Sequence, residues 1–314
     1  MMISVQKAAE IIKNGDVAAF PTETVYGLGA DAQNISAVKK TFIVKGRPSD
    51  NPLIVHISRV EQVHSLAVEI PPEFFMLAEA FWPGPLTIVL KKQRRVPDIV
   101  TGGLKTVAIR MPDHPLALEL IELTGPLTAP SANPSGKPSP TQAEHADLDY
   151  SGKIGVLDGG PTQIGIESTV LDLSSGRPEI LRPGAVTAGM IENIINKKVT
   201  EATGRNSTHL KSPGTRYTHY KPDASVQWLD KVPVRYDPEI YYILHSGPSP
   251  GKERNIHSYQ NNFEGLARDL YDHFRTADHL GYRRIYVEKL PVADTNPLIK
   301  AIANRVGKAA GSES

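Results

Sequence analysis

The segment from Lys45 to His56 combines two cations, a glycine and two prolines with an apolar strand that ends in histidine. Lys45 offers a compact positive charge and Arg47 a planar fork of donors, which together suit the oxygens of a polyphosphate. Pro48 and Pro52 restrict the backbone, so these donors are held in place before a ligand arrives. The segment therefore predicts an anion-binding loop, with a surface turn as the alternative.

A second polar run, Pro21 to Gly29, directly follows the first predicted strand. Its hydroxyls and carboxylate suit a small polar ligand, because ligands of open α/β sheets bind beyond the carboxyl ends of strands. A helix-capping turn is the alternative. The run Gly27 to Ala32 also fits the dinucleotide pattern G-x-G-x-x-A, but this match is weak because the next predicted helix begins only near Ser36.

Arg110 ends an apolar run that begins at Thr106. A buried cation is costly unless it finds an anion. Two partners are open: a structural carboxylate such as Asp113 or Glu119, or a ligand carboxylate held by two hydrogen bonds.

The loop from Thr128 to Pro140 is dense in hydroxyls, amides and prolines. A rigid loop of this kind can aim serine, asparagine and backbone donors at phosphate or adenine, and a plain cluster of turns is the alternative. Gly136-Lys137 resembles part of a P-loop, but Pro138 stands where that motif needs Ser or Thr. Further along the chain, Ser168 and Arg182 add a hydroxyl and a cation next to predicted strands.

The histidines are scattered, and no pair has metal-ligand spacing together with a carboxylate. We therefore expect no dedicated metal site. Mg²⁺ carried in with a nucleotide remains open, because it needs few or no protein ligands. The pattern G-x-S-x-G is absent, which argues against Ser-His-Asp catalysis.

Alternating apolar strands and amphipathic helices would position these groups. Expected helices run from a cap at Ser4 to Gly15 and over residues 36–45, 59–67, 72–81, 114–123, 187–196, 263–277 and 296–306. Expected strands cover residues 17–20, 53–57, 86–90, 107–109, 127–129, 154–157, 168–173, 178–181, 241–244 and 284–287. This alternation predicts an α/β fold with a largely buried sheet.

The composition changes near residue 197, where the chain becomes polar and aperiodic. We predict a first, larger domain over residues 1–205, an interdomain linker over 206–225 and a small α/β domain over 226–314. Tyr217 and Tyr220 in the linker suggest a lid that folds over a ligand site and excludes water. A spacer that packs on the sheet is the alternative.

The overall composition excludes several classes of protein. The 314 residues allow two domains, and 40% apolar and 22% charged residues are typical of a globular protein. The net charge of +1 argues against a protein that wraps nucleic acid. Without cysteine, disulfides and thiolate chemistry are excluded. No apolar run approaches the roughly 18 residues of a membrane span, so a cytoplasmic protein is expected.

Taken together and in order, these motifs resemble the YrdC-like threonylcarbamoyl-AMP synthases. The resemblance rests on the runs 21–29, 45–56, 82–87, 107–112, 129–133 and 167–169. The segment 212–222 and the tail with Asn304-Arg305 resemble the longer, two-domain form of that family. The resemblance implies a YrdC-like twisted mixed sheet with a concave cavity, followed by a small Rossmann-like domain.

The resemblance also implies the reaction. Such nucleotidyltransferases condense L-threonine, bicarbonate or CO2 and ATP to L-threonylcarbamoyladenylate and pyrophosphate. The product serves a downstream transferase machinery that forms N6-threonylcarbamoyladenosine beside the tRNA anticodon, with direct tRNA contact left open.

Site residues follow from the same resemblance. Lys45 and Arg47 would be catalytic. ATP would contact Lys45, Arg47, Asn51, Thr106, Ser131, Asn133, Ser139, Arg182, Tyr217 and Tyr220. L-threonine would contact Thr24, His56, Arg110, Ala129 and Ser168. His56 is one hypothesis for the base, with solvent or phosphate as alternatives.

Two other functions compete with this one. The carbamoyltransferase of hydrogenase maturation shares the YrdC-like module but carries cysteine-rich zinc segments, which this chain lacks. An RNA-binding module that uses the concave face is the non-enzymatic alternative, and the near-neutral charge makes it the weaker hypothesis.

Overall fold

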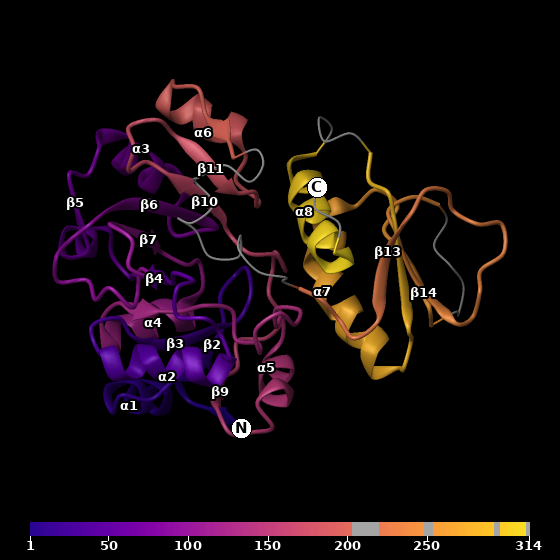
Figure 1. The fold of residues 1–314 in the computed structure, drawn as a ribbon, viewed down its shortest axis with the longest axis horizontal. Coiled ribbons are helices and arrows are strands. Elements are labelled where there is room, and N and C mark those ends of the chain that lie inside the picture. Colours follow the sequence, from indigo (N-terminus) through magenta and orange to yellow (C-terminus); the bar gives the residue numbers. More distant parts are fainter. Residues whose placement is uncertain (203–219, 248–253, 292–295, 312–314) are drawn as a thin grey trace.

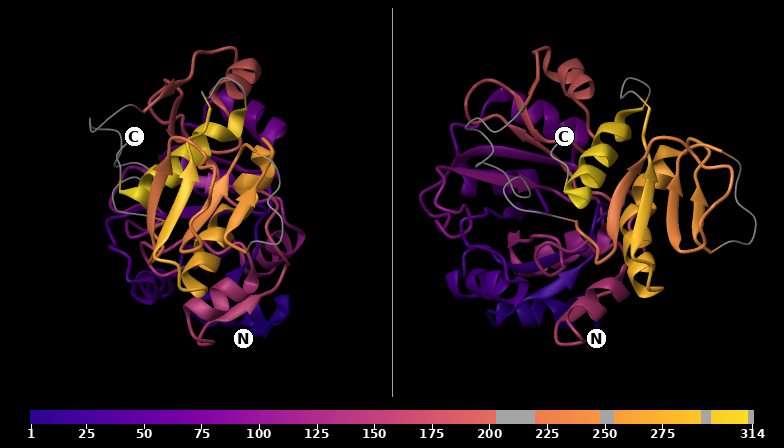
Figure 2. Two further views of the ribbon diagram at one scale, coloured as in Figure 1. Left: turned by 90° about the vertical axis from the view of Figure 1, so that its right-hand side faces the viewer. Right: turned by 45° about the vertical axis from the view of Figure 1, so that its right-hand side comes forward.

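Two β-sheets lie on opposite sides of a pair of helices in the computed structural model, which describes residues 1–202, 220–247, 254–291 and 296–311 (Figure 1). The larger sheet belongs to the N-terminal part of the chain. The smaller sheet is C-terminal, and its helices α7 (Phe263–His279) and α8 (Pro297–Ala310) lie between it and the larger domain in both Figure 1 and Figure 2.

The larger sheet is mixed, and its strands run in the order β1-β9-β2-β3-β8-β4-β7-β6-β10-β11-β12, with β5 paired to β6. Its first strands along the chain are β1 (Met2–Ile3), β2 (Ala18–Phe20), β3 (Gly27–Asp31), β4 (Ile54–His56), β5 (Ala67–Val68) and β6 (Leu86–Lys92). The remaining strands are β7 (Thr106–Arg110), β8 (Leu127–Thr128), β9 (Gly155–Leu157), β10 (Thr169–Asp172), β11 (Glu179–Arg182) and β12 (Thr200–Glu201). β4 and β7 are parallel neighbours, which places His56 opposite Arg110 where both strands end.

Helices bury both faces of this sheet. α1 (Val5–Lys13) and α4 (Pro115–Thr124) share one apolar cluster with β2, whereas α2 (Ile35–Lys45) and α5 (Ala143–Asp149) contribute to another. α3 (Pro72–Phe81) and α6 (Ala188–Ile195) belong to the largest cluster, which also contains side chains of β4, β6 and β7. The α/β fold with a mixed sheet is therefore confirmed.

Most predicted helices and strands are present, and the errors in their predicted ends and types have local causes. Ser4 caps α1 as predicted, and its side chain accepts a hydrogen bond from the Lys7 amide. The predicted start of α2 at Ser36 was wrong by one residue, because Asn34 is the cap and accepts from two amides. The predicted helix over 59–67 is a 3-10 helix, η1 (Val60–Ser65).

The strand β3 was not predicted, because its sequence Gly-Leu-Gly-Ala-Asp is typical of a turn. It pairs with β2 on one side and β8 on the other. A Cβ at Gly29 would lie 3.0 Å from the ring of Phe20, so glycine here permits a close approach of the two strands. Since this segment is a strand and not a phosphate-binding loop, the dinucleotide interpretation was wrong.

The C-terminal domain is a parallel sheet of four strands in the order β13-β16-β14-β15. These strands are β13 (Ser225–Leu229), β14 (Ile240–Leu244), β15 (Ile256–Ser258) and β16 (Arg284–Glu288). β14, β16 and both helices were predicted, whereas β13 and β15 were not. Of the predicted linker, Tyr220 and the residues that lead into β13 are described, whereas residues 206–219, and with them Tyr217, lie outside the described residues.

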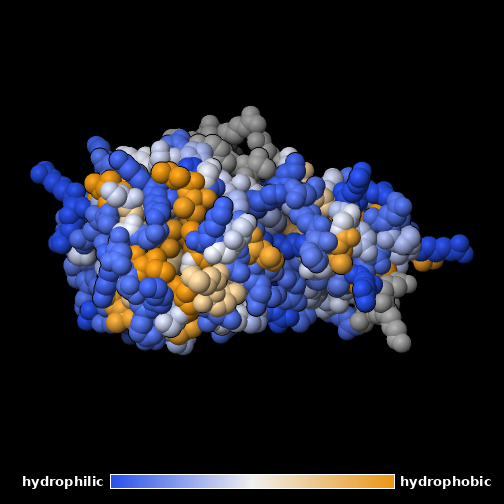
Figure 3. Space-filling model, turned by 90° about the horizontal axis from the view of Figure 1, so that it is seen from below, coloured by the Kyte–Doolittle hydropathy of each residue, from blue (hydrophilic) through white to orange (hydrophobic). Residues whose placement is uncertain are grey.

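Apolar side chains gather on the N-terminal domain in the view from below (Figure 3). Exposed apolar residues include Ile43 on α2, 78% exposed, and Leu148 on α5, 75% exposed. Apolar atoms contribute more than half of an ordinary protein surface, so this face is not exceptional. No helix within the described ranges is long and apolar enough to cross a membrane.

Candidate functional site

A cavity opens among strands and loops of the larger sheet, with Tyr220 of the segment before β13 at its wall. Its empty volume, with the solvent at its mouth included, is about 620 Å³. The residues that line it are Thr22, Thr24, Val25, Gly27, Arg47, Pro52, Leu53, Ile54, His56, Arg110, Ala129, Pro130, Ser131, Glu167, Ser168, Arg182 and Tyr220. The polar runs singled out in the sequence therefore converge on one place, although the chain between them spans most of the domain.

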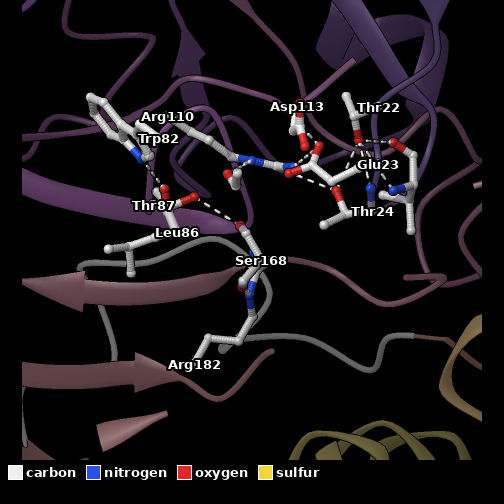
Figure 4. Close-up of polar contacts among 12 residues, drawn as sticks. Thr22, Glu23, Thr24, Trp82, Leu86, Thr87, Arg110, Asp113, Ser168 and Arg182 are labelled. Carbon is white, nitrogen blue, oxygen red and sulfur yellow. Dashed lines mark hydrogen bonds and ion pairs between the residues drawn. The ribbon is translucent and has the colours of Figure 1, made fainter. Parts of the chain in front are cut away.

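Arg110 forms an ion pair with Glu23, and both side chains are almost fully buried (Figure 4). The Arg110 Nη2 atom lies 2.6 Å from Glu23 Oε2, and Nη1 donates to Thr24 Oγ1 at 2.9 Å. The suggested structural partners Asp113 and Glu119 were wrong. Asp113 instead donates its backbone N–H to Glu23, so one carboxylate orients both the guanidinium and the loop behind it.

His56 is buried beside Arg110 and is electrically neutral over the physiological pH range. Burial, supported by the nearby Arg110 charge, lowers the pKa of His56 to about 3. Its Nδ1 atom is buried and has no hydrogen-bond partner among the residues that the structure describes. An imidazole with so low a pKa is a poor base, so the geometry favours a hydrogen-bonding role over the base hypothesis.

Ser168 also lines the cavity and is held by two neighbouring side chains (Figure 4). The hydroxyls of Ser168 and Thr87 share a hydrogen bond of 2.8 Å. Arg182 donates through Nε to the Ser168 carbonyl at 3.0 Å and through Nη2 to its hydroxyl at 3.1 Å. These contacts fix a hydroxyl and a guanidinium side by side on the cavity wall.

Glu167 is the functional residue that sequence reasoning missed. Its carboxylate accepts from Ser139 Oγ at 2.6 Å, from Tyr271 Oη at 3.0 Å and from Arg305 Nε at 2.8 Å. Burial raises the pKa of Glu167, but the Arg305 and Arg182 charges and the hydrogen bonds outweigh it and lower the pKa to about 2. Glu167 is therefore an anion at the cavity wall.

This pKa predicts how stability depends on pH. The folded-state pKa of Glu167 is about 2, below the ordinary 4.5, so its contribution is complete above about pH 4.5 and lost as the pH falls toward 2. The contribution is on the order of 3 kcal/mol. Between pH 6 and pH 3, the melting temperature should fall further in the wild type than in Glu167→Gln. Equal losses in the two proteins would contradict this assignment.

Lys45 does not line the cavity among the described residues. It ends α2 and is buried, and its ammonium donates to the carbonyl oxygens of Ser131 and Asn133. Burial, with the Arg47 charge as a second cause, lowers the pKa of Lys45 well below its ordinary value. Arg47 does line the cavity, and its Nη2 atom donates to the Pro52 carbonyl at 3.0 Å. Lys45 thus supports the loop that carries Ser131, and Arg47 faces the cavity.

The other predicted site residues also fall into two groups, those that line the cavity and those that do not. All five predicted L-threonine contacts line the cavity: Thr24, His56, Arg110, Ala129 and Ser168. Among predicted ATP contacts, Arg47, Ser131, Arg182 and Tyr220 line it. The remaining described ones, Lys45, Asn51, Thr106, Asn133 and Ser139, are not part of this lining. Their contacts with ATP stay predictions.

The residues outside the lining have visible contacts of their own. Asn133 Nδ2 donates to the carbonyls of Pro134 and Lys137, each at 2.8 Å, which closes the turn. Ser139 holds Glu167. Thr106 begins β7, so it lies about 13 Å along the strand from Arg110 at the usual rise per residue.

The described residues contain no group of three His, Asp or Glu side chains arranged to hold a metal ion. Glu167 is the one carboxylate among the described lining residues, and Arg305, Tyr271 and Ser139 already bind it. These side chains do not form a metal cage.

Two family models together match nearly the whole chain. The Sua5/YciO/YrdC family model, described as "Telomere recombination", matches residues 10–184. A second model, "Threonylcarbamoyl-AMP synthase, C-terminal domain", matches residues 186–311.

Similar proteins cover nearly the whole chain. A threonylcarbamoyl-AMP synthase of Pyrococcus abyssi is 45% identical over 97% of this chain and 93% of its own. A threonylcarbamoyl-AMP synthase of Bacillus subtilis is 44% identical over 98% of this chain and 93% of its own. A crystal structure of P. abyssi Sua5 in complex with L-threonine matches with a TM-score of 0.89 at 43% identity, over 99% of this chain and 98% of that one. The chain therefore belongs to the Sua5/YciO/YrdC family, in the two-domain form that carries the C-terminal domain of threonylcarbamoyl-AMP synthases.

Proposed function

We propose that this enzyme condenses L-threonine, bicarbonate or CO2 and ATP to L-threonylcarbamoyladenylate and pyrophosphate. The observation that carries the proposal is that Arg110, His56, Ser168, Arg47 and Arg182 all line one cavity. Arg110 could then bind a carboxylate while Arg47 and Arg182 bind phosphates of a second ligand in the same cavity. Membership in this family supports the assignment.

The amino acid fits the Arg110 end of the cavity. Its carboxylate would accept from the guanidinium, and Thr24, already bonded to Arg110, would adjust to it. His56 is neutral, and its Nδ1 atom is unpaired within the described part of the chain, so it can bond the amine or hydroxyl without adding charge. Ser168 and the Ala129 backbone complete this end.

The nucleotide fits the end lined by Arg47, Ser131 and Arg182. The deprotonated threonine amine attacks CO2 through its nitrogen lone pair, a C=O π bond shifts onto oxygen, and the released N–H proton passes to solvent or phosphate, which leaves a carbamate. A carbamate oxygen then attacks the α-phosphorus, the bond to the bridging oxygen breaks, and pyrophosphate leaves with the electron pair. The protein contributes position and positive charge to this transfer. Lys45 serves it by holding the carbonyls of Ser131 and Asn133.

Mg²⁺ would enter with ATP and be held by its phosphates, since the cavity does not provide a cage of carboxylates. The ion supplies charge neutralisation on the triphosphate. We place the enzyme in the cytoplasm, where its product would pass to the transferase machinery that modifies tRNA beside the anticodon.

The test of this function is pyrophosphate release from ATP with and without L-threonine and bicarbonate, together with mass detection of the adenylate. Turnover should require all three substrates. Turnover that ignores threonine would overturn the assignment, and tight, salt-sensitive RNA binding without turnover would favour the RNA-binding alternative.

Single substitutions should separate the two ends of the cavity. Arg47→Ala removes a charged donor worth about 1.5–3 kcal/mol, so the KM for ATP should rise roughly 10- to 100-fold. His56→Ala removes a neutral hydrogen bond of about 0.5–1.5 kcal/mol, so the KM for threonine should rise roughly 3- to 10-fold. Steady-state kinetics with each substrate varied in turn measures both, and identical effects on both substrates would refute the division.

A further inference from the structure

Three consecutive residues of the N-terminal domain connect the cavity to the C-terminal domain. Ile166 is fully buried in the apolar cluster of the C-terminal domain, next to side chains of α7 and α8. Glu167 binds Tyr271 of α7 and Arg305 of α8. Ser168, the next residue, faces the cavity. One short segment therefore joins the packing of the second domain to the predicted substrate contacts of the first.

Arg305 is the central group of this connection. Its side chain is 0% exposed, and all three guanidinium nitrogens are bonded. Nε donates to the Glu167 carboxylate at 2.8 Å, Nη1 to the Pro183 carbonyl at 2.8 Å, and Nη2 to the Glu167 carbonyl at 3.2 Å. Pro183 directly follows Arg182. Arg305 thus holds the main chain beside both Ser168 and Arg182 without lining the cavity itself.

We propose that Arg305 of the C-terminal domain is a positioning residue for the site in the N-terminal domain, where it keeps Arg182 and Ser168 in place by binding Glu167. The inference rests on the proposed function, because it assigns Arg182 to the nucleotide. It gives the C-terminal domain a defined part in the reaction: a buried guanidinium that neutralises a carboxylate at the cavity wall.

The electrostatic reason is competition for Glu167. Both Arg305 and Arg182 lower its pKa, so both guanidiniums act on the same carboxylate. With Arg305 present, Glu167 has a bonded cation and Arg182 donates to Ser168. Without Arg305, Glu167 remains a buried anion, and Arg182 and Lys308 are cations of the described residues that interact with its charge. Arg182 would then turn from the nucleotide end, and Glu167 would repel the triphosphate.

The experiment compares full-length variants by pyrophosphate release at a temperature well below their melting transitions. In Arg305→Gln the KM for ATP should rise at least 10-fold, while kcat at saturating ATP changes less than 3-fold. In the double variant Arg305→Gln with Glu167→Gln, the uncompensated anion is gone, so most of the ATP affinity should return. Arg305→Lys keeps the positive charge but cannot donate to all three partners of the guanidinium. Its KM for ATP should lie between those of the wild type and Arg305→Gln.

Asp149→Asn is the matched control. Asp149 also forms an interdomain ion pair, with Arg275 Nη2 at 2.7 Å, but neither residue lines the cavity. This variant should keep the wild-type KM for ATP. The proposal is overturned if Arg305→Gln keeps that KM, if Asp149→Asn raises it as much, or if the double variant recovers nothing. A wild type that releases no pyrophosphate with threonine would instead refute the proposed function.

Discussion

Arg110→Ala is expected to remove nearly all threonine-dependent pyrophosphate release. The substitution deletes the cation that would bind the substrate carboxylate, and it leaves Glu23 buried without its ion-pair partner. Truncating one member of a buried charge pair costs about 2–5 kcal/mol. The KM for threonine should therefore rise by roughly 30-fold or more, because the abandoned Glu23 carboxylate also repels the substrate.

Glu23 provides the control for this result. The double variant Arg110→Ala with Glu23→Gln removes the repelling charge but does not restore the guanidinium donor. It should therefore regain part of the stability and little of the activity. Melting curves and steady-state kinetics on threonine separate these effects. Threonine kinetics in Arg110→Ala within threefold of wild type would show that Arg110 has only a structural role with Glu23.

Gly165→Ala is expected to disturb the contact between the two domains and so impair the enzyme. Gly165 has a φ of +77°, and a Cβ there would lie 2.2 Å from the Arg268 carbonyl oxygen and 2.4 Å from the Arg268 Cα atom. Both atoms are backbone of α7, which cannot move aside alone. Overpacking costs about 1–3 kcal/mol, and the left-handed conformation adds roughly 1–2 kcal/mol for alanine.

Gly176→Ala separates the effect of the left-handed backbone from the effect of the clash with α7. Gly176 also has a φ of +77°, but nothing lies within 4 Å of its added Cβ. Its melting temperature should fall only slightly, and its KM for ATP should stay at the wild-type value. Gly165→Ala should lose more stability and raise the KM for ATP, because Glu167 lies two residues further along the displaced segment. Equal behaviour of the two alanine variants would contradict this account of the interface.

Many residues that line the cavity could be predicted from the sequence, because their signal is local. Arg110 and His56 end apolar strands, and the carboxyl ends of parallel strands meet at one edge of a sheet. Their polar character after a run of apolar residues was therefore a usable signal. The ion-pair partner of Arg110 could not be predicted in this way, because Glu23 is distant in the chain and no periodicity links the two residues.

Other features depend on long-range packing that local patterns do not encode. Glu167 and Arg305 are separated by 138 positions, and each alone resembles an ordinary charged residue. β3 was missed because glycines oppose strand formation locally, while pairing with strands on both sides overrides that preference. Lys45 was identified as a cation near the site, but its two carbonyl partners become visible only when the loop is folded.

The distance in sequence between Glu167 and Arg305 has a consequence for biosynthesis. A ribosome adds roughly 5–20 residues per second, so the 138 positions between these residues take roughly 7–28 seconds to translate. During that interval the nascent N-terminal domain carries Ile166 and Glu167 without the apolar cover and the counter-charge they have in the finished protein. Chains that terminate before codon 305 never acquire that charge. The ion pair therefore makes synthesis of the chain through α8 a condition for the Arg305 counter-charge at the cavity wall.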